Sequence, residues 1–180
     1  MNPTFLAVAL LSLAISGQVR AELRREGSDA VLSDKPRCRF AWPDWDYTNI
    51  TNPLILTKST LDQSMIGIMR IPAGRTLPQG KTKVAAGMTG KQITSLLREN
   101  LQGRGHKVEG MAFVPAKIAG TEAVQVRYAQ RGTPTKRGVE YGFVRDGFFF
   151  YLLFVAVEGP HFANQQKDFE RVASTFRVLQ

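Results

Sequence analysis

The alternation of apolar and polar residues is clearest in the last third of the chain. Residues 124–128 and 139–143 carry apolar side chains at every second position, the pattern of strands with one face on a core. Asp146-Gly147 follows the second of these strands and is a favoured two-residue hairpin turn. Residues 148–157 are ten consecutive apolar or aromatic residues. A membrane-spanning helix needs about 20, so this run predicts an interior strand that is covered on both faces.

A helix is predicted to close the chain. Gly159-Pro160 ends the apolar run, and Phe162, Phe169, Val172 and Phe176 then recur at helical spacing with charged residues between them. This pattern indicates a helix that packs an aromatic stripe onto the sheet.

Upstream, shorter patterns predict further strands and one more helix. The strands are expected at residues 38–42, 54–57, 65–71 and 107–117, the last interrupted by Pro115. Thr89 and Gln92 have the spacing of a capping box at a helix start, and Gly103 is a natural stop for that helix. A loop rich in Gly, Pro and Lys, residues 72–87, precedes the helix. Strands mostly in hairpin order with two helices predict a single α+β domain, an antiparallel sheet that is packed with helices in a sandwich.

Four segments carry a resemblance to a known superfamily. They are GTEAVQVRY (120–128), FFFYLLF (148–154), FERVASTF (169–176) and RFAWPDW (39–45). Their order resembles that of the PsbP and Mog-like superfamily, which includes DcrB-like bacterial periplasmic proteins. The resemblance implies that the sheet and helices over residues 37–180 form an α/β/α sandwich. The superfamily is functionally mixed, so the resemblance constrains function only weakly.

The N-terminus has the pattern of a secretory signal peptide. Residues 5–15 are apolar apart from Ser12, and Val19-Arg20-Ala21 presents small residues at the two positions that a signal peptidase reads. We therefore expect a signal peptide at residues 1–21, cleavage near Ala21 and a periplasmic or secreted protein with no transmembrane helix. A buried N-terminal helix or an uncleaved anchor are the alternatives. Residues 22–36 are charged and poor in apolar residues, which predicts a flexible leader.

The single cysteine, Cys38, limits the possible chemistry. It lies too far from the apolar run to be a lipoprotein cysteine, and one cysteine cannot form an internal disulfide. Neighbouring arginines could activate its thiol, but a small residue packed in the core is the favoured interpretation.

Positive charge is concentrated in the middle of the chain. The full sequence has 24 Lys and Arg against 15 Asp and Glu, a net charge of +9. Thirteen of the basic residues but only three of the acids lie between Arg70 and Arg137. If the loops there converge, they form an anion- or partner-binding patch; scattered charges that only keep the protein soluble are the alternative. The candidate patch residues are Arg75, Lys81, Lys83, Arg104, Lys107, Lys136 and Arg137.

No catalytic or metal-binding constellation is recognisable. Neither histidine, His106 or His161, has metal-ligand spacing, and nucleophile-elbow, phosphate-loop and calcium-loop motifs are absent. Trp42 and Trp45 flank Pro43 and could stack a ring, although a core position for one of them is favoured. We expect no cofactor, no metal and no enzyme activity; an enzyme using a histidine is the least favoured class.

These observations predict an exported, non-catalytic accessory or assembly protein that acts through contacts with a protein partner in the cell envelope. The first alternative is binding of anionic envelope surfaces, such as the membrane, through the basic loops. The second is a periplasmic immunity or inhibitor protein. Nucleic acid is not expected, because an exported protein rarely meets it.

Overall fold

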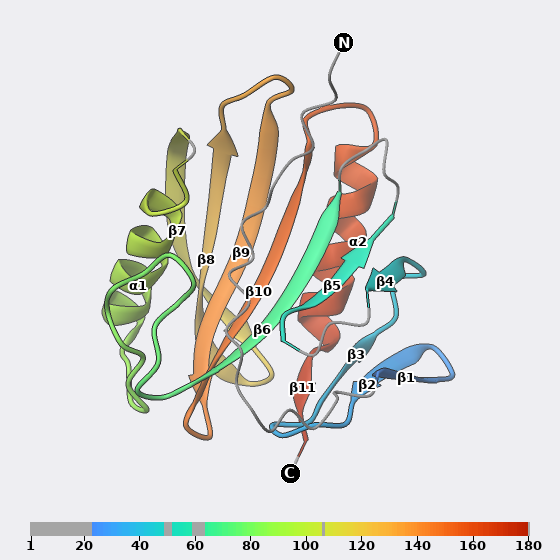
Figure 1. Cartoon of the computed structure of the whole chain (residues 1–180). Coiled ribbons are helices and arrows are strands. Elements are labelled where there is room, and N and C mark those ends of the chain that lie inside the picture. Colours follow the sequence, from blue (N-terminus) through green and yellow to red (C-terminus); the bar gives the residue numbers. More distant parts are fainter. Residues whose placement is uncertain (1–22, 49–51, 59–63, 106, 180) are drawn as a thin grey trace.

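The computed structural model describes residues 23–48, 52–58, 64–105 and 107–179 (Figure 1). The main feature is an antiparallel sheet of seven strands. In spatial order these are β4 (Asp46–Thr48), β5 (Leu54–Thr57), β6 (Met65–Pro72), β10 (Phe148–Val157), β9 (Lys136–Arg145), β8 (Thr121–Gln130) and β7 (Val108–Ile118). A smaller antiparallel sheet has the order β1 (Leu23–Glu26), β2 (Asp29–Leu32), β3 (Cys38–Ala41) and β11 (Arg177–Val178).

The apolar run forms an interior strand of the large sheet, as its sequence predicts. β10 pairs with β6 on one side and with β9 on the other. The turn between β9 and β10 places Asp146 and Gly147 at φ 52° and 76°, the positive values that a two-residue hairpin of this kind requires. Phe143 and Phe150 stack with their ring centroids 5.0 Å apart, which joins the two strands on one face.

Each helix packs on a different face of the sheet (Figure 1). α1 (Gly90–Gln102) begins at the capping box of Thr89 and Gln92 and ends at Gly103, both as expected. Its buried leucines pack with Val126 and Tyr151. α2 (Phe162–Thr175) covers the opposite face, where Phe169 packs with Phe154 and Tyr141. An antiparallel α+β domain with two helices is therefore confirmed.

Residues 23–36, within the flexible leader expected at residues 22–36, form a hairpin and a turn that pack on the domain. β1 and β2 form a hairpin that pairs with β3, and Ala30, Val31 and Leu32 are buried. The following turn is held by Arg70, whose guanidinium forms a two-pronged ion pair with the carboxylate of Asp34 at 2.7 and 2.9 Å. Most of the charged residues of this hairpin are exposed, whereas Ala30 and Leu32 belong to the core cluster and the partly buried Leu23 packs against it.

The expected signal peptide, residues 1–21, lies outside the described residues. Among the residues that are described, no helix has the length and apolar character needed to cross a membrane.

Candidate functional site

The predicted basic patch is divided among three places in the fold. Arg75, Lys81 and Lys83 lie in the loop between β6 and α1, and Lys107, Lys136 and Arg137 lie where β7 and β9 begin. Arg104 follows α1 and points into the protein, where it pairs with a buried glutamate. The three groups have different electrostatic surroundings.

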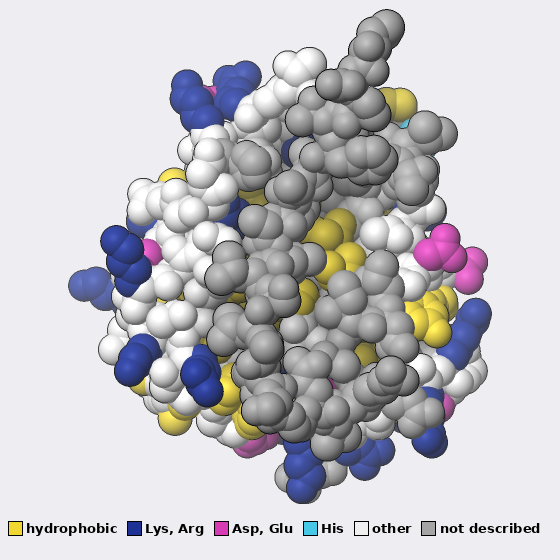
Figure 2. Space-filling model, viewed as in Figure 1, with side chains coloured by type: hydrophobic (Ala, Val, Ile, Leu, Met, Phe, Trp, Pro, Cys, Tyr) yellow, Lys and Arg dark blue, Asp and Glu magenta, His cyan; other side chains and the backbone are white. Residues whose placement is uncertain are grey.

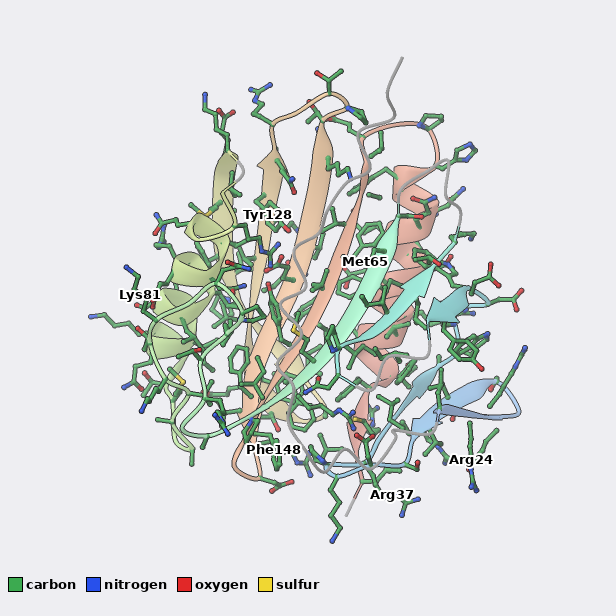
Figure 3. All side chains as sticks on the ribbon, in the orientation of Figure 1. Arg24, Arg37, Met65, Lys81, Tyr128 and Phe148 are labelled. Carbon is green, nitrogen blue, oxygen red and sulfur yellow. The ribbon has the colours of Figure 1, made fainter. Side chains whose placement is uncertain are left out.

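The loop of residues 73–89 is fastened along α1. Leu77 and Val84 are buried in the cluster that α1 forms with the sheet. The carboxylate of Glu99 on α1 accepts hydrogen bonds from the backbone N–H groups of Lys81 and Thr82. Hydrogen bonds from Thr82 and from the backbone of Lys81 lower the pKa of Glu99 below its ordinary value. These contacts hold the loop's lysines against the helix, and Figure 3 places Lys81 on the outer side of α1.

Two further cations on α1 extend this surface. Lys91 and Arg98 are seven residues apart and therefore share one face of the helix. The guanidinium of Arg98 lies 4.5 Å from the ring centroid of Phe113 on β7. Neither residue was among the candidates predicted from the sequence, although their helical spacing could have indicated them.

We call these exposed cations the α1 basic face. It consists of Arg75, Lys81, Lys83, Lys91 and Arg98. Within the described part of the chain, none of the five forms an ion pair with a carboxylate. Glu99 is the one acid of α1, and its oxygens are taken by backbone N–H groups. Figure 2 shows dark blue side chains spread over the side of the molecule where α1 and this loop lie.

The cations at the start of β7 and β9 are mostly paired. Glu109 lies 3.0 Å from the ammonium of Lys107 and 2.6 Å from the guanidinium of Arg131. Arg137 pairs with Glu158. Lys136 is buried, and this burial lowers its pKa. This end of the sheet therefore presents less free positive charge than the α1 basic face.

Arg104 belongs to a buried polar network under α1. Its Nη1 lies 2.8 Å from Oε1 of Glu140, a residue with no exposed surface. The hydroxyls of Tyr128 and Tyr151 each accept a hydrogen bond from Arg104 and donate one to Glu140. Asn100 on α1 donates to the hydroxyl of Tyr151 at 3.2 Å. Every charged member has a partner, as buried charges require.

The surroundings of this network favour the neutral tyrosines. Burial, followed by the nearby charge of Glu140, raises the pKa of both Tyr128 and Tyr151 well above its ordinary value. Burial alone would lower the pKa of Arg104, but its interactions with Tyr151 and Glu140 raise that pKa overall. Arg104 is thus a charged residue that holds the end of α1 to the sheet, and it is not a member of a surface patch.

The remaining candidate residues contribute no assembled chemistry. His161 precedes α2 without a side-chain hydrogen bond to the helix, and His106 lies outside the described residues. No three of the His, Cys, Asp and Glu residues in the described ranges gather into a group that could hold a metal. Trp45 is buried and donates to Asp168, whereas Trp42 is half-buried beside Tyr47. The surface feature that stands out among the described residues is therefore the charge of the α1 basic face.

No protein-family model and no curated protein sequence matches the chain. Solved structures do. Cyanobacterial PsbP (CyanoP) from Synechocystis sp. PCC 6803 is 10% identical, and the match covers 94% of this chain and 99% of that one with a TM-score of 0.51. A protein from Bacteroides thetaiotaomicron VPI-5482 is 11% identical over 89% of this chain, with a TM-score of 0.50. This chain spans about half of that protein, 49% of its length.

A third similar structure is that of LpqN from Mycobacterium tuberculosis, described as involved in cell envelope biogenesis. It is 10% identical over 92% of this chain and 88% of its own, with a TM-score of 0.43. At such identities a likeness concerns the fold alone. The match to cyanobacterial PsbP confirms, at the level of the fold, the resemblance expected from the sequence, and the chain has the PsbP-like fold.

Proposed function

We propose that this protein is a non-catalytic, exported accessory protein of the cell envelope that binds anionic surfaces through the α1 basic face. Export is supported by the signal-peptide pattern, with cleavage near Ala21. A binding role is supported by the exposed cations of the α1 basic face, and the described residues contain no group of His, Cys, Asp and Glu that could hold a metal.

The observation that carries the proposal is the set of five exposed cations without a carboxylate partner. An unpaired Lys or Arg close to an anionic membrane surface contributes about 1 kcal/mol. Five of them on one face would give detectable binding that weakens as salt screens the charges. The ion pairs at the start of β7 leave that end of the sheet a weaker candidate.

The rigid attachment of the loop strengthens this argument. Glu99 holds Lys81 and Thr82 by their backbone N–H groups, and Leu77 anchors the same loop in the core. The lysine side chains therefore project from a fixed platform and lose less freedom on binding than they would from a mobile loop.

A contact with a protein partner is the second candidate. β7 is an edge strand of the large sheet, and Val114 on it is one of the exposed large apolar residues, with 45% of its surface accessible. An edge strand can accept an additional strand from a partner. Pro115 and the irregular register between Glu109 and Ala112 limit the length of strand that this edge can accept.

Vesicle co-sedimentation tests the proposed function. The purified protein should bind vesicles rich in phosphatidylglycerol at low salt and release them at high salt. It should not bind phosphatidylcholine vesicles. The variant Lys81→Glu/Lys83→Glu should lose this binding. Lys35→Glu/Arg37→Glu is the matched control, because it reverses two exposed charges in the turn between β2 and β3, and Figure 3 shows Arg37 away from Lys81. Binding that resists salt, or that both double variants weaken equally, would contradict the proposal.

A further inference from the structure

Three arginines surround one alanine on the face of the sheet opposite α1. Arg127 lies two positions before Ala129 on β8 and shares its face of the sheet. Arg131 follows the end of β8 and lines the same groove as these two residues. Arg137 on β9 is the cross-strand partner of Ala129. We call this arrangement the arginine niche: Arg127, Arg131 and Arg137 around the small side chain of Ala129.

The opposite side of the niche is formed by β7 and α2. Glu109 on β7 is the second cross-strand partner of Ala129 and pairs with Arg131 at 2.6 Å. Phe162 and Gln166 in the first turns of α2 line the same groove, which has a volume of about 450 Å³. The first turn of α2 carries no acidic residue and so adds no negative charge. The groove lies on the α2 face, away from the α1 basic face.

Such a concentration of arginines is unfavourable unless something neutralises it. Arg127 lies diagonally across from Arg137, because its direct cross-strand partner is Val139, and like charges placed closely across strands destabilise a sheet. Among the described residues, the guanidinium of Arg127 has one hydrogen-bond partner, the uncharged amide oxygen of Gln125 at 3.1 Å. Among the described residues, Glu109 is the carboxylate that lines the groove, and Glu158, which follows β10, pairs with Arg137 at its edge.

The ion pairs of the other two arginines do not prevent them from taking a ligand. The side chains of Arg131 and Arg137 are 63% and 54% exposed. Exposed ion pairs are worth about 0–1 kcal/mol, so an anion that meets several guanidinium groups can replace or share them at little cost. A guanidinium presents two parallel N–H donors, a geometry that suits a phosphate group.

We propose that the arginine niche binds a small ligand that carries a terminal phosphate group with two negative charges. Arg127 provides the uncompensated charge, Arg137 the facing donors, and Ala129 the space in which the phosphate sits. The same chemistry occurs in free phosphomonoesters and in the head group of phosphatidic acid. This site is independent of the α1 basic face and of the function proposed for it.

Titration with glycerol 3-phosphate at constant ionic strength tests the free-ligand form, with glycerol as the uncharged control. The lipid form is tested by comparing vesicles that contain phosphatidic acid with vesicles that contain the same fraction of phosphatidylglycerol. Saturable binding of glycerol 3-phosphate, or a preference for phosphatidic acid, is expected, and the arm that responds identifies the source of the phosphate. The absence of both would overturn the proposal.

Variants separate the niche from general electrostatic attraction. Arg127→Gln should weaken phosphate binding at least about tenfold, the equivalent of about 1.4 kcal/mol. Lys91→Gln removes the same charge from the α1 basic face and should leave the phosphate affinity unchanged. Ala129→Met keeps the charge but places a large side chain where the phosphate would sit, so it should abolish binding. The proposal would be overturned if Lys91→Gln lost as much phosphate affinity as Arg127→Gln, or if both niche variants bound phosphate as tightly as the wild type. The binding of phosphatidylglycerol vesicles does not enter this comparison.

Discussion

The ring of Tyr128 lies directly over Gly138, its cross-strand partner on β9. A Cβ atom at position 138 would lie 2.1 Å from Cζ of Tyr128, far inside van der Waals contact. The hydroxyl at the far end of this ring donates to Glu140 at 2.7 Å, so the ring is held from both sides. The glycine is therefore a condition for the buried polar network, because it makes room for the tyrosine that bridges Arg104 and Glu140.

Gly138→Ala should consequently destabilise the fold. The ring of Tyr128 must shift and lose part of its hydrogen bonding, and overpacking of this kind costs about 1–3 kcal/mol. Urea unfolding measures the loss. Gly159→Ala is the control, since a Cβ there would meet no atom within 4 Å. Equal stabilities of the two alanine variants would show that Tyr128 has more freedom than its contacts indicate.

Removal of Arg104 should be more damaging than removal of a surface arginine. Arg104→Ala leaves the carboxylate of Glu140 buried without its cation, and breaking a buried pair in this way costs about 3–5 kcal/mol. Adding Glu140→Gln to the same chain removes the uncompensated charge and should restore part of the stability in urea unfolding. A double variant that is no more stable than Arg104→Ala would contradict this account.

The arrangement of Glu140 and Arg104 also shows where prediction from sequence ends. The alternation in residues 139–145 correctly indicated a strand and correctly placed Val139, Tyr141 and Phe143 on one core. The same pattern predicted that only one face of this strand lies on a core, so Glu140 was expected on the exposed face. In the structure α1 packs on that face, and Glu140 is fully buried. Alternation shows which residues share a face of the strand. Whether each face is buried depends on how distant segments of the chain pack on it.

The basic patch failed to assemble as one surface for a similar reason. Proximity in sequence placed Arg104 and Lys107 together, yet one points under α1 and the other pairs with Glu109 at the sheet end. The interior position of β10, the capping box and the Asp146-Gly147 turn were predictable because their signals are local. The hairpin of β1 and β2 was not, since its few apolar residues are buried only through β3.

Glu99 should make the stability of the loop attachment depend on pH. Its pKa is lower in the folded protein than in the unfolded chain, so its contribution is fully present above the unfolded pKa and disappears as pH falls through the folded pKa. Glu99→Gln should therefore lower the melting temperature near neutral pH and have a smaller effect at pH 3. A difference between variant and wild type that stays constant from pH 7 to pH 3 would show that the Glu99 charge plays no part.

Cys38 should be unreactive as long as the protein is folded. Its side chain is buried in the core and donates from Sγ to the carbonyl of Pro36 at 3.4 Å. Burial raises the pKa of the thiol to about 12, against the opposing influence of Arg70. At pH 8 the folded protein therefore holds almost no thiolate, which is the nucleophilic form. A thiol reagent such as iodoacetamide should label Cys38 rapidly in denaturant and very slowly in buffer, with a rate in buffer that follows global unfolding. Rapid labelling of the folded protein would show that the edge between β3 and β11 opens locally and that the neighbouring arginines activate the thiol.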